Sequence, residues 1–255
     1  MAALCASCPV RRLPPFQPFD AAALALAQRS VLARRRLAAE TDLLRTDDLG
    51  GGFYTLWAGW AYRYREVAPQ DGSPASWRIV DILLPGDMFG LEAALTGRVG
   101  NPVRALTQVT VCAHDPRVLA SALRDHPDFA RALVETNLHD MERAEARLAA
   151  ANQVGGAQKT AHLVLELRDR LAARDMAPGL TEDGSGRMPF PLQRRHLAAA
   201  LGMSGTHVTR SFGELDAAGL ARVDGQELVI LDAERLAALC GYLPVSEPPG
   251  HRAII

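Results

Sequence analysis

The sequence predicts an α+β protein in which an N-terminal antiparallel β-roll is followed by a long helix and a C-terminal winged helix-turn-helix. Three observations support this order. Short β-like runs separated by glycine turns extend from about residue 34 to residue 114. Residues 128–153 then contain neither proline nor glycine and have a helical pattern. Finally, residues 191–223 have the pattern of two short helices joined by a turn, followed by a β-ribbon.

The N-terminal part is expected to begin with an Ala/Leu helix over residues 20–33, with Asp20 as its N-cap. Three β-like runs follow, over residues 49–67, 77–84 and 105–115. Gly59 lies between aromatic residues in the first run and predicts a hairpin pivot, whereas Gly86 and Gly90 mark a tight turn. Several short strands with regular turn signals favour a small roll or barrel.

The long helix has a narrow apolar seam made of Leu138, Met141 and Leu148, with Ala144 and Ala151 beside them. Charged residues flank this seam, an arrangement typical of coiled-coil pairing. A helix that packed only against its own domain would need a broader apolar stripe. We therefore expect a parallel dimer helix.

These patterns predict three domains: a sensor roll over residues 1–126, a dimerisation helix over 127–153 and a DNA-binding domain over 154–255. Gly155 and Gly156 predict a hinge at the start of the third domain. A helix is expected over residues 157–174, and a Pro/Gly-rich linker over 176–188. Asp232 is expected to cap a last helix after the ribbon.

The first helix of the motif carries Leu197 and Leu201 at i and i+4, which defines one apolar stripe. Gly202 is suited to end this helix because it accepts a left-handed backbone conformation. Ser204 is a favourable N-cap for the second helix.

The second helix separates into two faces. The inward face carries Val208, Phe212 and Leu215 at i, i+4 and i+7. The outward face carries Thr206, Thr209, Arg210 and Gly213. A polar second helix of this kind lies in the DNA major groove in helix-turn-helix proteins. Arginine suits such a face because its planar fork bonds guanine O6 and N7 together.

Further residues separate this motif from an ordinary helical hairpin. The first helix starts with four side chains suited to phosphate contact: Gln193, Arg194, Arg195 and His196. Gly219 is expected to close the second helix, and two short strands are expected around an Asp224-Gly225 hairpin turn. The complete pattern predicts a winged helix that binds double-stranded DNA.

Composition limits the class of protein. The chain has 255 residues, of which 48% are hydrophobic and 22% charged, so it is globular and not disordered. A formal net charge of −1 provides no overall basic field, so DNA contact depends on a local patch. The sequence has neither the apolar core of a signal peptide nor a membrane-spanning run, and four cysteines do not suggest a disulfide framework. We expect a cytoplasmic protein without a membrane partner.

A roll, a long helix and a winged helix in this order resemble the Crp/Fnr family of bacterial transcription regulators. The resemblance covers almost the whole chain and is carried by LPGDMFG (84–90), GGAQKTAHLVLELRDRL (155–171) and PLQRRHLAAALGMSGTHVTRSFGELDAAGL (191–220). It implies a homodimer that places two recognition helices in successive major grooves of a near-palindromic site. RNA polymerase is a further expected partner of such a regulator.

The resemblance also implies roles for individual residues. Arg210 matches the recurrent base-contacting arginine, Gln193 and Arg195 match backbone-contacting positions, and Ser204 matches the cap of the recognition helix. The expected DNA-binding set is therefore Gln193, Arg195, Ser204, Gly205, Thr206, His207, Thr209 and Arg210. This chain departs from the common pattern at Thr206, where many members have glutamate, and Gly205 stands at the variable position before it. The Thr206-His207 pair resembles a subgroup with an HVxR ending, which implies a different half-site.

Three hypotheses remain open for the signal that the roll senses. Cyclic nucleotide is disfavoured, because members that bind it resemble one another in a Gly-Glu pair and an Arg-Ser or Arg-Thr pair. Here Glu92 is displaced by one position from Gly90, and neither Arg98 nor Arg104 is followed by serine or threonine. A roll with another effector, or with none, is a second hypothesis.

The third hypothesis is an iron–sulfur cluster. Cys5 and Cys8 resemble the N-terminal thiols of the family's oxygen-sensing branch, and Cys112 matches that branch's distant fourth ligand. Thiolates are the ligands that such clusters require. Pro14 stands where that branch has another cysteine, so a carboxylate, His114 or an external ligand is needed to complete the set. Cys240 is expected to belong to the core.

One alternative function is a metal- or thiol-based redox protein whose helical end serves only for assembly. An enzyme is not expected, since the sequence contains no His/His/Glu cluster, nucleophile motif or phosphate-binding glycine loop.

Overall fold

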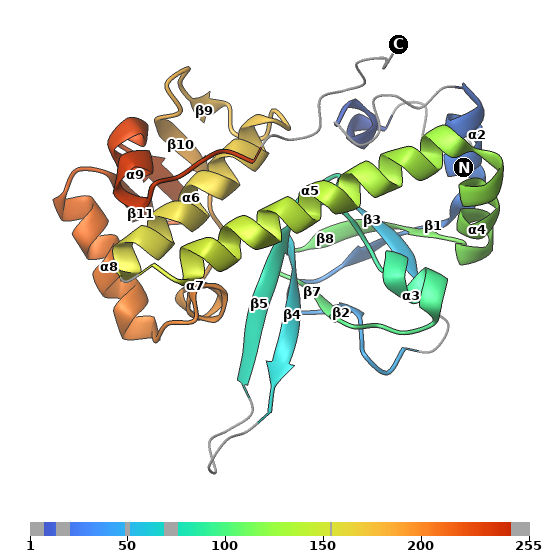
Figure 1. Ribbon diagram of the computed structural model, residues 1–255, viewed down its shortest axis with the longest axis horizontal. Helices are drawn as coiled ribbons and strands as arrows, with labels where there is room; N and C mark the ends of the chain where they lie inside the picture. Colours follow the sequence, from blue (N-terminus) through green and yellow to red (C-terminus); the bar gives the residue numbers. More distant parts are fainter. Residues whose placement is uncertain (1–7, 14–20, 49–51, 69–75, 154, 246–255) are drawn as a thin grey trace. The chain divides into compact units, whose positions relative to one another are not determined.

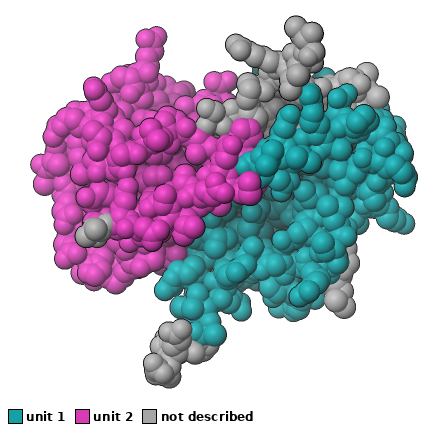
Figure 2. Space-filling model, in the orientation of Figure 1, with its two compact units in different colours: residues 1–138, 248–255 teal, residues 139–247 magenta. Residues whose placement is uncertain are grey.

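The computed structural model describes residues 8–13, 21–48, 52–68, 76–153 and 155–245 (Figure 1). The chain divides into two compact units, the first made of residues 1–138 with 248–255 and the second of residues 139–247 (Figure 2). Each unit is described by itself below. Within the described part of the chain, no helix combines the length and apolar character needed to cross a bilayer.

The first unit starts with a short 3-10 helix, η1 (Pro9–Arg12), and with α2 (Ala21–Ser30). Its strands form two antiparallel sheets. The order in one sheet is β1-β8-β3-β6, with bounds Val31–Leu37, Val109–His114, Phe53–Ala58 and Met88–Phe89. The order in the other sheet is β2-β7-β4-β5, with bounds Asp42–Leu44, Val103–Ala105, Ala61–Val67 and Ser76–Leu83. The predicted antiparallel β-roll is confirmed.

The interior of the roll is filled by apolar side chains from both sheets. Alternation along each strand sends every second residue inward, so Val109 and Val111 of β8 meet Val103 and Ala105 of β7 in one buried cluster. Leu56, Leu83 and Phe89 belong to the same cluster and are almost fully buried. Burial of this apolar surface is the main stabilisation of the roll.

The chain crosses from one sheet to the other at Gly59. The strands on its two sides, β3 and β4, belong to different sheets and do not pair with each other. The predicted hairpin pivot at this glycine is therefore wrong. Gly59 is still required, because its φ is +84° and a Cβ there would collide with the carbonyl oxygen of Gln108.

Three helices complete the first unit: α3 (Leu91–Thr96), α4 (Pro116–Asp125) and the start of α5 (Pro127–Ala151). Asp115 caps α4 by accepting a hydrogen bond from the backbone N–H of Arg117 at 2.9 Å. A second apolar cluster joins α2, α4 and α5 to the outer face of β3; its buried members are Leu26, Phe53, Leu119, Ala122, Phe129 and Leu133.

The expected first helix is shorter than predicted. It ends at Ser30, and β1 begins at Val31, where the chain pairs with His114 of β8. Residues 31–33 therefore adopt the strand because tertiary pairing prevails over the local Ala/Leu pattern. The predicted cap, Asp20, lies outside the described residues.

The second unit contains the C-terminal half of α5, then α6 (Gly156–Ala172), α7 (Arg194–Leu201), α8 (Gly205–Ala217) and α9 (Ala233–Cys240). A four-stranded sheet has the order β11-β12-β10-β9, with bounds Ala221–Asp224, Glu227–Ile230, Gly186–Pro189 and Gly179–Leu180. Two of these strands lie where the sequence predicts only a linker, over 176–188, so that prediction is wrong. β10 forms because it pairs with β12, some forty residues further along the chain.

Candidate nucleic-acid interface

The first helix of the motif, α7, is fixed at its start by a side chain that faces inward. The backbone N–H of Gln193, the N-cap residue, donates to Nδ1 of His196 at 3.2 Å. His196 is buried, so the expectation that it contacts phosphate is wrong, and it instead stabilises the helix start. Gln193, Arg194 and Arg195 are exposed.

The turn between α7 and α8 has the predicted chemistry. Gly202 has a φ of +64° and ends α7 by donating its N–H to the carbonyl oxygen of Ala198. Ser204 then caps α8, and its Oγ accepts a hydrogen bond from the backbone N–H of His207 at 3.3 Å. The turn between the two helices is therefore fixed by local bonds at Gly202 and Ser204.

The inner face of α8 packs into the second unit. Val208 and Leu215 are buried, and Phe212 is half-buried with its ring against Phe190 at a centroid distance of 6.2 Å. The predicted inward face is confirmed. These contacts leave the opposite side of the helix free of packing.

The outer face of α8 carries exposed polar side chains, namely Thr206, His207, Thr209 and Arg210. The side chain of Arg210 is 67% exposed and has only a loose ion pair, 3.7 Å from Nε to Glu214 Oε1. Thr209 donates its hydroxyl hydrogen to the carbonyl oxygen of Gly205 at 3.1 Å, which leaves its oxygen as an acceptor. The surface is thus polar, convex and helical, as a major-groove reader requires.

Two neighbouring elements extend this surface. Arg194 of α7 lies over Gly205, where its side chain is 3.4 Å from the position of a Cβ, and so adds a cation at the start of α8. The ribbon formed by β11 and β12 is the predicted wing, with Gly225 and Gln226 as its two loop residues. The expected Asp224-Gly225 turn is thus displaced by one residue, since Asp224 pairs with Glu227.

The predicted seam on α5 is exposed. Leu138, Met141 and Leu148 have 48%, 52% and 66% of their surface accessible, which is unusual for large apolar side chains on one helix face. The sequence analysis missed Val134, which is 58% exposed and extends the seam by one turn. Its i, i+4 spacing with Leu138 was the available signal.

The loop after α3 shows how the roll satisfies its own polar groups. The carboxylate of Glu92 accepts hydrogen bonds from the backbone N–H groups of Gly100 and Asn101. Arg104 is bound through both its Nε and its Nη2 to Asp42 on the neighbouring strand, with Nε 2.6 Å from Oδ1. Of the two arginines considered as anion ligands, Arg104 is therefore bound to Asp42, and Arg98 lies exposed on the surface.

Burial raises the pKa of the Cys112 thiol, and charge on Cys8 adds slightly to this rise. Both are half-buried free thiols, and Arg34, paired with Cys112 across β1 and β8, stacks over the Trp57 ring at 4.7 Å. The Arg34 guanidinium opposes the rise in the pKa of the Cys112 thiol. The described residues contain no group of three or more His, Cys, Asp or Glu side chains that would hold a metal, and Cys5 lies outside them.

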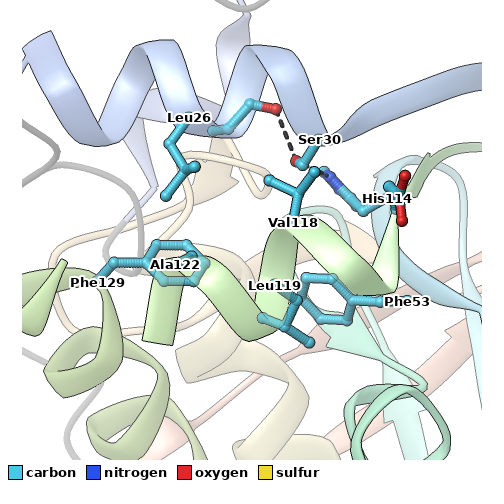
Figure 3. Close-up of a pocket in the computed structure, with 10 residues that line it drawn as sticks. Leu26, Ser30, Phe53, His114, Val118, Leu119, Ala122 and Phe129 are labelled. Atoms are coloured by element: carbon cyan, nitrogen blue, oxygen red, sulfur yellow. Dashed lines mark hydrogen bonds between the residues drawn. The ribbon is translucent and has the colours of Figure 1, made fainter. Parts of the chain in front are cut away.

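His114 ends β8 beside a small apolar pocket lined by α2, α4 and α5 (Figure 3). Ser30 donates its hydroxyl hydrogen to the carbonyl oxygen of Ala27 at 2.8 Å, so it accepts from His114 Nδ1 at 2.9 Å. Thr55 then donates to His114 Nε2 at 3.0 Å. This pattern requires the neutral ring, and burial lowers its pKa to about 4. His114 is held between strands and helix and is not presented as a metal ligand here.

Cys240 is buried at the end of α9, as expected for a core residue, and burial raises the pKa of its thiol. Tyr242 follows it and donates its hydroxyl hydrogen to Asp169 of α6 at 2.8 Å. These contacts attach α9 to α6 behind the helix-turn-helix. Together, the fold and the exposed face of α8 define a DNA-binding regulator of the winged-helix class.

Comparison with known proteins agrees with this class. The family described as Crp-like helix-turn-helix domain matches residues 158–239. The nitrogen fixation regulation protein FixK of Bradyrhizobium diazoefficiens is 26% identical over 236 residues, which span 92% of this chain and 93% of that protein. A CRP-like cAMP-activated global transcriptional regulator of Mycobacterium tuberculosis is 26% identical over 160 residues, 62% of this chain and 68% of that protein.

Among solved structures, FixK2 from Bradyrhizobium japonicum superposes with a TM-score of 0.68 at 20% identity, covering 83% of this chain and 98% of that one. The chain is similar to Crp/Fnr regulators along most of its length, contains a Crp-like helix-turn-helix domain, and is a DNA-binding transcription regulator. Its relatives are regulators and not enzymes, and the interpretation as a redox protein whose helical end serves only for assembly is set aside.

Proposed function

We propose that this regulator acts as a homodimer that reads an inverted-repeat DNA site, with one α8 helix in each of two successive major grooves. The observation that carries the proposal is the exposed polar face of α8, on which the Arg210 side chain is 67% accessible. A side chain so weakly bound within its own chain is available for a base edge. A cytoplasmic location follows from this function.

Individual residues have distinct roles in this proposal. Arg210 bonds guanine O6 and N7, and Thr206, His207 and Thr209 contact neighbouring base edges. Gln193 and Arg195, exposed at the start of α7, contact phosphates and fix the register on the duplex. Ser204 holds the start of α8 through its cap, and Gly205 leaves room for close approach.

Dimerisation is proposed to use the exposed seam of α5. A parallel pair of α5 helices buries Val134, Leu138, Met141 and Leu148 of both copies. Such a pair places the two α8 helices about one helical turn of DNA apart, near 34 Å. RNA polymerase is proposed as a further partner of the DNA-bound dimer.

The experiment is selection of bound duplexes from a random DNA library, followed by affinity measurements over a range of salt concentrations. We expect an inverted repeat with a recurrent guanine in each half-site, and affinity that falls with salt for both selected and random DNA. Enrichment of no sequence, or of a single unrepeated element bound by one copy of the chain, would contradict the proposal.

We further propose that the roll is the sensing unit and that Cys5, Cys8 and Cys112 supply its thiolate donors. The small electrostatic effect of Cys8 on the Cys112 thiol supports this set. The described residues offer two of its thiols, and an iron–sulfur cluster needs four ligands. When bound, a cluster supplies oxygen-sensitive electron chemistry. A signal in the roll is proposed to alter the tilt of the paired α5 helices and so the spacing of the two α8 helices.

Anaerobic purification, iron and sulfide assays and a visible spectrum test the thiol site. We expect a coloured protein whose absorbance is lost in Cys112→Ser and retained in Cys240→Ser, since Cys240 belongs to the core of the second unit. A colourless wild-type protein without iron would show that the signal is of another kind.

A further inference from the structure

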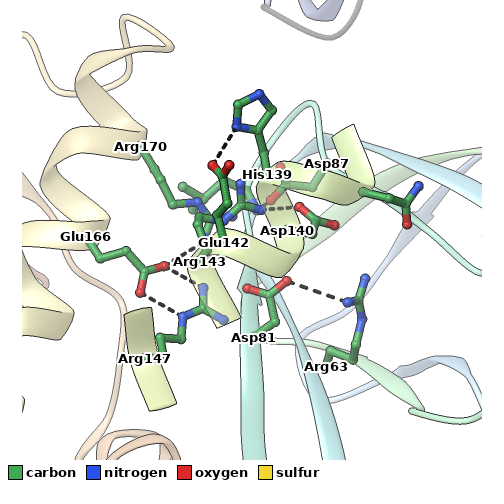
Figure 4. A network of polar contacts seen from close by, with 12 residues as sticks. Arg63, Asp81, Asp87, His139, Asp140, Glu142, Arg143, Arg147, Glu166 and Arg170 are labelled. Atoms are coloured by element: carbon green, nitrogen blue, oxygen red, sulfur yellow. Dashed lines mark hydrogen bonds and ion pairs between the residues drawn. The ribbon is translucent and has the colours of Figure 1, made fainter. Parts of the chain in front are cut away.

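A buried ion pair joins the end of α5 to α6 within the second unit (Figure 4). Arg147 of α5 donates from Nε to Glu166 Oε2 at 2.7 Å and from Nη2 to Glu166 Oε1. The side chains are only 21% and 6% exposed, so the pair is largely shielded from water. The two parallel bonds fix the relative orientation of both planar groups, which a single contact would not do.

A second arginine contacts the same carboxylate from within α6. Arg170 donates to Glu166 Oε1 at 3.4 Å and is 3% exposed. It lies four residues after Glu166 on α6, so its contact is internal to that helix. Because Arg170 keeps Glu166 partly neutralised, loss of Arg147 does not leave the buried carboxylate without a cation. The two-bond link from α5 to the Glu166 carboxylate is made by Arg147.

The orientation of α6 is passed on to α8. A Cβ at Gly156, the first residue of α6, would collide with Ser211 Oγ of α8, so these helices are in close contact. The predicted hinge at Gly155-Gly156 is therefore a close-packing position on its α6 side. Between α5 and α6 run only residues 152–155, where Gln153 donates to the carbonyl oxygen of Cys240 at 2.6 Å.

We propose that Arg147 and Glu166 are positioning residues for operator recognition. Their bond holds α6, and with it α8, at one angle to the dimerisation helix. In a dimer this angle sets which half-site separation the two α8 helices reach together, because a small rotation at the end of α5 displaces each recognition helix along the DNA. The inference rests on the proposed function and deepens it.

The test measures affinity for three kinds of duplex: the selected inverted repeat, repeats with one or two base pairs added or removed between half-sites, and a single half-site. Arg147→Gln removes the ion pair, and Arg147→Lys keeps the positive charge but cannot make two parallel bonds to Glu166. Arg117→Gln is the matched control, since the side chain of Arg117 is 89% exposed. Light scattering records the oligomeric state of each variant.

For Arg147→Gln we expect about a tenfold loss on the optimal repeat and a flatter dependence on half-site spacing. Half-site affinity should stay within about twofold of wild type, because α8 itself is intact. Arg147→Lys should give an intermediate spacing profile and Arg117→Gln the wild-type profile. If Arg147→Gln does not fold, the spacing profile of Arg147→Lys tests the inference instead: a profile flatter than that of wild type supports it, and an unchanged profile overturns it.

Equal losses on the repeat and the half-site, or an unchanged spacing profile in a folded variant, would overturn the inference. A wild-type protein that shows no preference for a repeat over a half-site would instead overturn the proposed dimeric function, so the two failures are distinguishable.

Discussion

The outer face of α8 and the β-roll treat their polar side chains in opposite ways. On α8, Arg210 has only a loose ion pair at 3.7 Å and stays largely exposed. In the roll, Arg104 is bound through two nitrogens to Asp42, and Glu92 accepts two backbone N–H groups. The difference indicates that the first region keeps its hydrogen-bonding capacity for a partner, whereas the second satisfies its own.

The largest expected effect is that of a substitution in the apolar seam of α5, because the proposed dimer needs this seam to present two α8 helices to DNA. Leu138→Glu adds a charge to an exposed position, so the monomer should fold while the paired helices separate. Binding to the inverted repeat should fall about 100-fold or more, because two linked reading surfaces become independent. Light scattering and titration of labelled duplex check both effects.

Leu95→Glu is the matched control for this prediction, since Leu95 is a similarly exposed leucine at 52% on α3. It should leave the dimer and its affinity unchanged. A dimeric Leu138→Glu protein with wild-type affinity would place the interface elsewhere.

A second prediction concerns the roll, whose polar groups bond within the chain. There His114 must stay neutral to keep its hydrogen bonds to Ser30 and Thr55. Its pKa of about 4 in the folded roll lies below the usual histidine pKa of 6.5, so the unfolded chain binds the proton first as the pH falls. Stability is therefore lost as the pH drops from about 6.5 towards 4, by about 2 kcal/mol between pH 7 and pH 5.

His114→Gln removes this titration. Denaturant unfolding at pH 7 and pH 5 should show a smaller loss in the variant than in wild type, and the contribution of His162 cancels in the difference. A parallel fall in both proteins would mean that His114 binds its proton equally well in the folded and the unfolded chain.

The smallest expected effect is the response to cyclic nucleotide. The carboxylate of Glu92 already binds the backbone N–H groups of Gly100 and Asn101. Millimolar cyclic AMP should therefore change neither the melting temperature nor the affinity for the selected duplex. A clear rise in melting temperature would show that the loop exchanges its internal carboxylate for a phosphate.

The α8 surface can be predicted from the sequence because its helix ends and faces are set by residues close together in the chain. Gly202 ends α7, Ser204 caps α8, and Val208 marks the inner face, and each of these signals spans only a few residues. The exposed position of Arg210 follows from helix periodicity alone. His196 was misassigned because a basic residue at a helix start has the same pattern whether its ring caps the helix or meets phosphate.

Long-range pairing explains what was not predictable. Gly59 has the local pattern of a hairpin, yet the choice between two sheets is decided by partners on β7 and β8. Residues 186–189 have linker composition and form β10 only because β12 supplies the hydrogen-bonding edge. The Arg147–Glu166 pair has no sequence signal, since its partners lie on different helices.

The most direct test of the central claim compares Arg210→Ala with Arg195→Ala on the selected site and on random DNA. We expect Arg210→Ala to lose about 1–3 kcal/mol of binding free energy on the selected site and little on random DNA, and Arg195→Ala to weaken binding to both alike. Equal losses on both duplexes for Arg210→Ala would contradict the account, because Arg210 would then be a phosphate contact and α8 would not read bases through it.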